Sequence, residues 1–140
     1  MFLEKVEIFQ GLNSGFLEEV HRLAREERLS EGTVLFRAGD PAENLYVLKD
    51  GQVALTTGGK SSITFPIEES GAVFGWSALV EPRIYTATAE LTMDSILYSW
   101  DGNELLRIFE RHPKEGLLIL RRLARVIGSR LKASYERFGR

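Results

Sequence analysis

Short apolar runs separated by glycine turns fill residues 28–100, and they limit the chain to a fold made mainly of β-strands. Runs of this length at regular spacing are typical of a sandwich or barrel. We therefore predict about eight short antiparallel strands here, with a tight hairpin turn at Gly58-Gly59, because glycines tolerate the positive φ angles of such turns. The clearest runs are 33–36, 45–48, 52–57, 61–67, 85–91 and 95–100.

Helices are predicted on both sides of this β segment. Asn13 precedes apolar residues at steps of three and four, which indicates a capped amphipathic helix, and a short helical piece precedes it around residues 3–9. Asp101 and Glu104 form a capping-box pattern that opens a helix, and Pro113 ends that helix and starts another. The predicted division is N-terminal helices at 1–27, a β-roll at 28–100 and C-terminal helices at 101–138.

The last predicted helix carries two apolar stripes. One advances by alternate steps of three and four, as in the seam of a two-stranded coiled coil. The other, at Ile119, Leu123 and Val126, lies on a neighbouring face and can pack on the chain's own strands. A lone domain buries only one such surface, so we interpret the first stripe as a homodimer contact; the alternative is that both stripes are buried within one chain. The seam comprises Leu117, Leu120, Ala124, Ile127, Leu131, Ser134 and Phe138.

Length and composition indicate one soluble domain. A chain of 140 residues with 44% hydrophobic content can build its own core. The absence of cysteine excludes disulfides, thiolate nucleophiles and zinc sites built from sulfur, and it fits a reducing compartment. The N-terminus carries acid where a signal peptide needs base, and no run of about eighteen apolar residues occurs. We expect a cytoplasmic protein with no membrane contact.

The net charge of −2 hides an uneven distribution. Residues 111–140 hold nine Lys or Arg and two acids, a net charge of +7, and the remaining residues are correspondingly acidic. A basic tail can bind nucleic acid. Because no aromatic or groove-reading pattern accompanies the arginines, we instead interpret the tail as the solvated face of a long helix, with no direct DNA binding.

The stretch 71–90 predicts an anion site. Gly71 and Gly75 permit backbone conformations that other residues avoid, and residues 76–80 can then form one helical turn. Pro82 ends that turn, and Arg83 brings a positive charge beside its N–H groups. This pairing suits phosphate or carboxylate.

The order of elements and the motif in this stretch resemble the cyclic-nucleotide-binding domain of the catabolite-activator and protein-kinase-A regulatory families. Glycines of the family occur at Gly32, Gly39 and Gly51. The family's phosphate-binding cassette reads roughly Phe-Gly-Glu-Leu-Ala-Leu, then a loop, then Pro-Arg-Ala-Ala-Thr. This chain has Phe-Gly-Trp-Ser-Ala-Leu at 74–79 and Pro-Arg-Ile-Tyr-Thr at 82–86. The resemblance implies an α+β, mainly β fold: an eight-stranded antiparallel jelly roll with an N-terminal helix, a short cassette helix and two C-terminal helices.

The resemblance also implies a ligand, cyclic AMP or cyclic GMP, whose phosphate pairs with Arg83. Trp76 replaces the glutamate that accepts a hydrogen bond from the ribose, which should weaken binding by about 1.5–3 kcal/mol unless Ser77 or a backbone carbonyl substitutes as the acceptor. Ile84 and Tyr85 replace small residues, and Tyr85 fills part of the pocket if it points inward. The implied ligand-binding residues in the cassette are Phe74, Gly75, Trp76, Ser77, Ala78, Arg83, Ile84, Tyr85 and Thr86.

In the family the last helix covers the base and also forms the dimer, so ligand and dimer geometry are coupled by population shift. Arg125, Ser129 and Arg130 are candidates for this lid, with Arg122 less favoured. We expect no DNA-binding domain, because the chain ends at Arg140 just after the helix, and so a separate protein effector is implied.

Enzymatic patterns fail on specifics. Residues 75–79 begin like a nucleophile elbow but lack its final glycine, and His21 and His112 lie in no metal-binding spacing. Two hypotheses therefore remain. The chain is either a stand-alone sensor of a cyclic nucleotide or a related small anion, or a degenerate, ligand-free dimeric interaction module.

Overall fold

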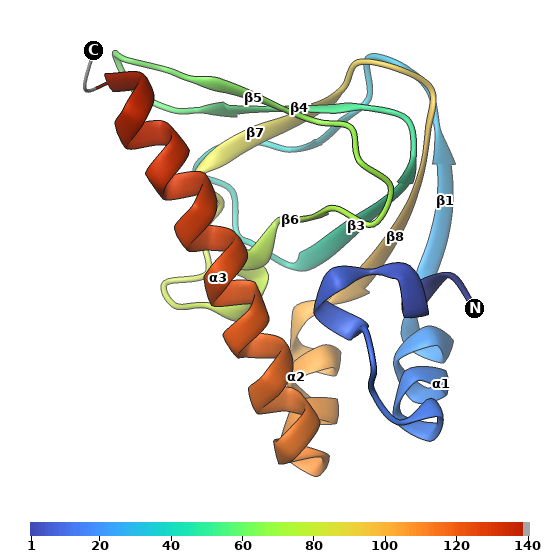
Figure 1. The fold of residues 1–140 in the computed structure, drawn as a ribbon. Helices are drawn as coiled ribbons and strands as arrows, with labels where there is room; N and C mark the ends of the chain where they lie inside the picture. The colour runs from blue at the N-terminus through green and yellow to red at the C-terminus, as the bar shows by residue number, and fades with distance from the viewer. Residues whose placement is uncertain (139–140) are drawn as a thin grey trace.

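Eight strands form two four-stranded antiparallel sheets that face each other as a roll, with α1 and α2 at one end and α3 running along the side (Figure 1). The structure is a computed structural model and describes residues 1–138. One sheet has the order β1-β8-β3-β6 and the other β2-β7-β4-β5. The predicted jelly roll is therefore confirmed. The strands are β1 Arg25–Leu29, β2 Val34–Phe36, β3 Asn44–Asp50, β4 Val53–Thr57, β5 Thr64–Ile67, β6 Val73–Phe74, β7 Ala87–Leu91 and β8 Ser95–Asp101.

Two features differ from the prediction. The roll begins at Arg25 and not at residue 28, because β1 pairs along β8 from Arg25 opposite Ser99 to Leu29 opposite Ser95. This charged strand lacks the apolar alternation that identified the others. The predicted tight turn at Gly58-Gly59 is wrong: β4 and β5 are joined by residues 58–63, and of the two glycines Gly59 has a positive φ, of 97°.

The helices follow the predicted order. Asn13 caps α1 by accepting hydrogen bonds from the N–H groups of Gly15 and Phe16, and Asp101 caps α2 by accepting one from Glu104. The turn-sized helix expected in the cassette is present between β6 and β7. The helices are the 3-10 helices η1 Phe2–Lys5, η2 Glu7–Phe9 and η3 Trp76–Leu79, and the α-helices α1 Ser14–Leu23, α2 Gly102–Arg111 and α3 Pro113–Phe138.

The core has two parts. One fills the roll, and the other joins α3 to the N-terminal segment, α2 and the outer side of the β3–β8 pair. The second stripe of α3 belongs to this helical core: Ile119 is 1% exposed and Leu123 is 2% exposed. This stripe therefore packs mainly among helices, whereas the sequence predicts packing on the strands.

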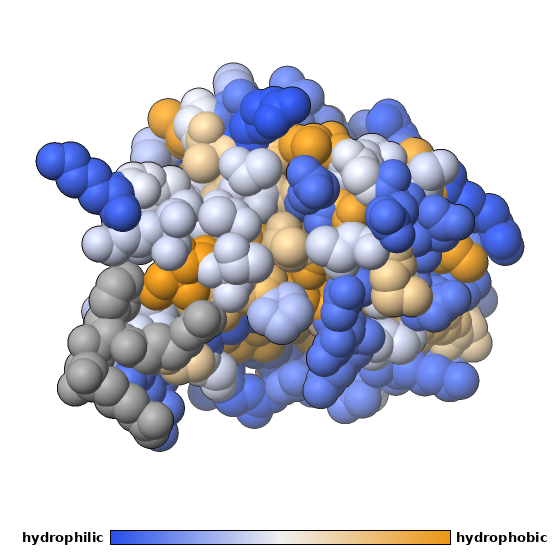
Figure 2. Space-filling view, turned by 90° about the horizontal axis from the view of Figure 1, so that it is seen from above, coloured by the Kyte–Doolittle hydropathy of each residue, from blue (hydrophilic) through white to orange (hydrophobic). Residues whose placement is uncertain are grey.

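The coiled-coil stripe of α3 lies on the surface. Leu117 is 60% exposed, Leu120 37% and Leu131 48%, while Ile127 is partly buried against the helical core. Phe138 ends α3, but its side chain lies outside the described part of the chain. Figure 2 shows the molecule from above the view of Figure 1. On this face, hydrophilic and weakly polar residues cover most of the surface, and hydrophobic residues appear in separate small groups.

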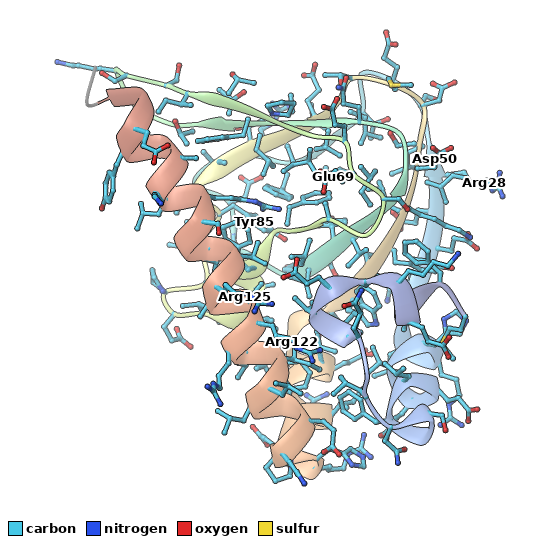
Figure 3. All side chains as sticks on the ribbon, viewed as in Figure 1. Arg28, Asp50, Glu69, Tyr85, Arg122 and Arg125 are labelled. Carbon is cyan, nitrogen blue, oxygen red and sulfur yellow. The ribbon has the colours of Figure 1, made fainter. Side chains whose placement is uncertain are left out.

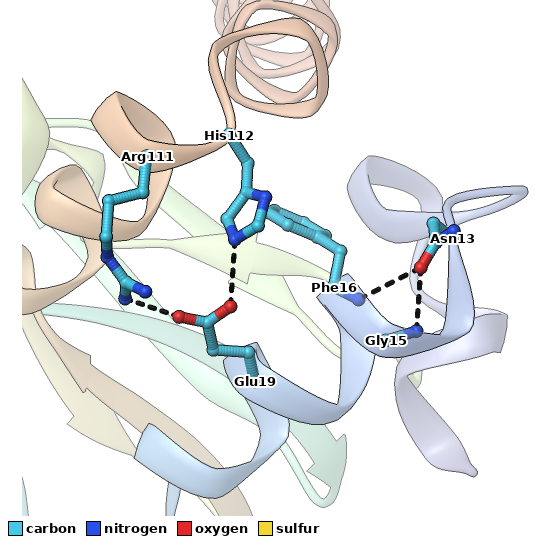
Figure 4. A network of polar contacts seen from close by, with 6 residues as sticks. All are labelled: Asn13, Gly15, Phe16, Glu19, Arg111 and His112. Carbon is cyan, nitrogen blue, oxygen red and sulfur yellow. Dashed lines mark hydrogen bonds and ion pairs between the residues drawn. The ribbon is translucent and has the colours of Figure 1, made fainter.

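A polar contact ties the corner between α2 and α3 to α1 (Figure 4). Glu19 forms an ion pair with Arg111 and a hydrogen bond of 2.9 Å with His112, whose ring also packs edge-on against Phe16. His112 is thus a residue of the helix corner. Among residues 1–138, no group of three or more acidic or histidine side chains could hold a metal ion, and no helix is long and apolar enough to cross a membrane.

Two glycines of α3 provide a matched test of this packing. A Cβ at Gly116 would lie 2.6 Å from Cβ of Phe109, whereas a Cβ at Gly128 would meet nothing within 4 Å. Gly116→Ala should therefore force α3 away from α2 and lower the free energy of unfolding by about 1–3 kcal/mol. Gly128→Ala should raise it by about 0.5–1 kcal/mol, because alanine restricts the unfolded chain. Urea denaturation measures both; equal effects would contradict the close contact between α2 and α3.

Candidate functional site

The cassette has the backbone geometry that its glycines predicted. Gly75 is left-handed, with φ of 76°, and η3 begins at the next residue. Within this turn the N–H of Ala78 already donates to Gly75 and that of Val80 to Ser77. The N–H groups of Trp76 and Ser77, at the start of the turn, take no part in these two bonds.

The side chain of Arg83 lies on the outside of the roll and is held there by two hydrogen bonds within the chain. Its Nη2 donates to the carbonyl of Ala78 at 2.8 Å, and its Nη1 donates to Oδ1 of Asn103, in the first turn of α2, at 2.7 Å. The residue has a positive φ of 61°, an uncommon conformation for a residue with a side chain. A role for Arg83 in binding phosphate stays a prediction, but here its guanidinium joins the cassette to α2.

Tyr85 occupies the inside of the roll (Figure 3). It is 5% exposed, and its ring stacks on Phe36 with centroids 3.7 Å apart. Its hydroxyl donates to the carbonyl of Asn44 at 2.7 Å and accepts from the N–H of the same residue at 3.0 Å. The stack continues from Phe36 to Tyr46 and from Tyr46 to Phe74. Four aromatic rings thus fill the space enclosed by the cassette.

Among the described residues, the cavity lined by the cassette, β2 and β4 measures about 40 Å³. Small-molecule sites usually measure about 300–1,000 Å³, and a water molecule occupies about 30 Å³. This cavity is therefore the size of one water molecule, and no charged side chain lines it. Its walls are Phe36, Leu55, Gly75, Trp76, Ser77, Tyr85, Thr86 and Ala87.

The predicted site residues are therefore divided between several places. Trp76, Ser77, Tyr85 and Thr86 line the cavity beside Gly75, and their role in binding a ligand stays a prediction. Phe74 and Ala78 are fully buried in the roll core behind it. Ile84, 44% exposed, faces away and forms a bridge with Pro41.

The predicted lid residues of α3 also separate. Arg125 donates a hydrogen bond to the carboxylate of Glu7 at 2.8 Å. Arg122 donates to backbone carbonyls of η2 and to that of Gln10, the last at 2.7 Å. Both arginines therefore point to the N-terminal segment (Figure 3). Ser129 is exposed. Arg130 alone of these reaches the cassette, and its guanidinium lies 4.8 Å from the centroid of the Trp76 ring.

Two contacts of this site were not predicted. Phe36 reads in the sequence as an ordinary strand residue, and nothing in the pattern showed that it would stack on Tyr85. Trp76 reads as a lost hydrogen-bond acceptor, whereas in the structure its ring receives Arg130. The four-residue spacing of Arg122, Val126 and Arg130 could have placed these side chains on one face, opposite to that of the seam.

The buried phenols predict a loss of stability at alkaline pH. Burial raises the pKa of Tyr46 to about 12 and also raises the pKa of Tyr85. Because an unfolded tyrosine ionises near pH 10, the stabilisation is complete below about pH 10 and is lost as the pH rises toward 12. Tyr46→Phe should flatten this decline in denaturation curves, and Tyr135→Phe, at a site 66% exposed, should not. An equal decline in both variants would contradict it.

Comparison with known proteins identifies the family. The model of the cyclic nucleotide-binding domain matches residues 26–112. Glutaminase 1 of Bradyrhizobium diazoefficiens is 26% identical over 126 residues, 89% of this chain and 20% of that protein. A cyclic nucleotide-gated potassium channel of Mesorhizobium japonicum is 33% identical over 100 residues, 69% of this chain and 26% of that protein. The chain thus spans about a fifth to a quarter of these relatives.

Solved structures agree on the fold. A Geobacter metallireducens protein described as cyclic nucleotide-binding is 26% identical, with a TM-score of 0.81, over 92% of this chain and 95% of its own. The catabolite activator protein of Thermus thermophilus is 21% identical, with a TM-score of 0.74, over 94% of this chain and 61% of its own. With its roll, cassette turn and terminal helices in the same order, the chain belongs to the cyclic nucleotide-binding domain family.

Proposed function

We propose that this chain is a regulatory module that works without a cyclic nucleotide in its roll and acts through α3. The observation that carries this proposal is the aromatic filling of the roll, which leaves a cavity of about 40 Å³ with no charged wall. A cyclic phosphate needs both space and a cation. Neither is offered inside the roll in this conformation.

The state of Arg83 supports the same conclusion. To pair with a phosphate inside the roll, its guanidinium would have to leave Ala78 and Asn103. Each hydrogen bond to a charged group contributes about 1.5–3 kcal/mol. Tyr85 would also have to leave Phe36 and break its two hydrogen bonds with Asn44. These losses would reduce the affinity for any nucleotide.

Isothermal titration calorimetry with cyclic AMP and cyclic GMP tests the proposal. We expect no saturable heat from the wild-type chain at millimolar nucleotide, because the roll is filled. Arg83→Ala is the matched variant, since it removes the one cation that the family motif assigns to the phosphate. A saturable heat in the wild type that disappears in Arg83→Ala would overturn the proposal.

That outcome would establish the second candidate function, a sensor of cyclic AMP, cyclic GMP or a related small anion. The observation that favours it is the match of the family model, which includes the whole cassette. The left-handed Gly75 and the turn after it keep the family's backbone. Rotation of Trp76 and Tyr85 out of the roll would then be the step that makes room.

We further propose that α3 forms a homodimer. Its exposed leucines lie beside a groove of about 360 Å³ between α2 and α3, and this groove extends the apolar stripe toward the start of the helix. Two helices that pair along such a stripe bury leucines that water would otherwise contact. The groove is lined by Leu106, Phe109, Glu110, Pro113, Gly116, Leu117 and Leu120.

Light scattering tests the dimer. The wild-type chain should have the mass of a dimer at micromolar concentration, and Leu131→Asp should convert it to a monomer by placing a charge in the seam. Lys132→Asp is the control, because this neighbouring residue is exposed and lies off the seam. A monomeric wild type, or equal effects of the two variants, would contradict the proposal.

The relatives support a regulatory role. In the glutaminase and the potassium channel, the segment similar to this chain is 20% and 26% of the protein. The similar segment thus accompanies two unrelated activities, as expected of a module that acts on an attached or separate effector. For this chain we propose a protein effector that responds to the position of α3.

A further inference from the structure

A second cavity lies outside the roll, where α3 crosses the N-terminal segment. It measures about 120 Å³, three times the volume left inside the roll, and the two cavities share no lining residue. Three parts of the chain meet there: η2, the segment that leads into β6, and the middle of α3. The lining residues are Glu7, Ile8, Glu69, Gly71, Ala72, Val73, Val126 and Arg130.

Arg130 brings a cation to this cavity without a complete set of partners. One face of its guanidinium is covered by the ring of Trp76. Its Nη1 is buried, and no acceptor for that nitrogen occurs in the part of the chain that the structure describes. Burial also lowers the pKa of Arg130 to about 10, so the side chain still carries its charge at neutral pH. A buried charged donor without an acceptor is costly, and an acceptor in the cavity would remove that cost if the guanidinium turned Nη1 toward it.

Three other charged residues around the cavity, Glu7, Arg122 and Arg125, already have partners. Arg125 pairs with Glu7, and Arg122 donates to three carbonyls, those of Glu7, Ile8 and Gln10. Glu69 lies on the rim with its side chain exposed. Buried positive charge therefore remains at Arg130, while the nearest unmatched acid is in contact with water.

The size of the cavity limits the ligand. A volume of 120 Å³ corresponds to about four water molecules. This is enough for a carboxylate or a phosphate group but far below the usual volume of a nucleotide-sized site. Because a guanidinium presents paired donors, planar or tetrahedral oxyanions match it best.

We propose that this cavity binds a small oxyanion, a carboxylate or an inorganic phosphate, through Arg130. The bound anion pairs with the guanidinium, turns Nη1 toward the cavity and leaves the ring of Trp76 over one face of the group. It thereby joins α3, the cassette and the segment before β6. The site is separate from the roll, so the proposal stands or falls independently of whether the roll binds a nucleotide.

Tryptophan fluorescence provides the measurement, since the chain has two tryptophans. Trp76 lies against Arg130, whereas Trp100 is 1% exposed and donates to the carbonyl of Val20, so it gives a constant background. Sodium phosphate and sodium acetate are titrated separately at constant ionic strength maintained with sodium chloride. We expect a saturable change at millimolar concentration with at least one of them, and the arm that saturates identifies the class of oxyanion.

Variants decide whether the response comes from this cavity. Arg130→Gln should weaken the response at least tenfold, while Arg125→Gln, at a neighbouring arginine that pairs with Glu7, should leave it unchanged. If Arg130→Gln does not fold by circular dichroism, Val126→Met serves instead, because it fills the cavity and retains the cation. Glu69→Gln should tighten binding a few-fold by removing a negative charge from the rim.

Three results would overturn the proposal. The first is no saturable change with either anion. The second is an unchanged response in Arg130→Gln or in Val126→Met, which would show non-specific binding. The third is weaker binding in Glu69→Gln, which would mean that the cavity attracts cations. The calorimetry with cyclic nucleotides tests the roll, and the fluorescence titration tests the cavity at Arg130. Failure of one proposal therefore leaves the other unaffected.

Discussion

The stack of Tyr85 on Phe36 is the contact on which the site depends. A phenol inside a β-roll requires partners for its hydroxyl, and the backbone of Asn44 supplies both an acceptor and a donor. With those bonds made, the ring becomes part of the core and links the cassette loop to β2 and β3. The enclosed volume is then set by aromatic packing. The interior beside the cassette is occupied by the stacked rings of Tyr85, Phe36, Tyr46 and Phe74.

The same packing explains where the arginines lie. An aromatic interior has no place for an unpaired guanidinium, because burying a charge without a partner costs several kcal/mol. Arg83 therefore binds Ala78 and Asn103 on the outside, and Arg122 and Arg125 bind the N-terminal segment. Arg130 is the exception. It is covered by an aromatic ring and keeps one buried nitrogen without an acceptor among the described residues.

The fold could be predicted largely from the sequence, because turn glycines and apolar spacing are local signals. Gly75 can be left-handed without steric cost, and Asn13 and Asp101 are favoured as N-caps, whatever their distant neighbours in the fold are. Strand β1 could not be found this way, since its residues are mostly charged and it is fixed by pairing with β8. The orientations of the side chains in the site could not be predicted from local sequence patterns either. Whether Tyr85 points inward depends on Asn44, a residue 41 positions away.

Helix α3 connects the cassette to the exposed leucines that we propose as a dimer contact. One side of this helix carries Arg130 against Trp76 and Arg122 against η2, and Ile119 and Leu123 fix it in the helical core. The exposed leucines on the same rigid helix turn whenever that side moves. The resemblance to the family implied that a nucleotide in the roll would position this helix. Here Tyr85 and its aromatic partners occupy the inside of the roll, and α3 is held both by the helical core and by its arginines. In the proposed homodimer, a signal that changes the partners of these arginines would reach the exposed leucines of the same helix.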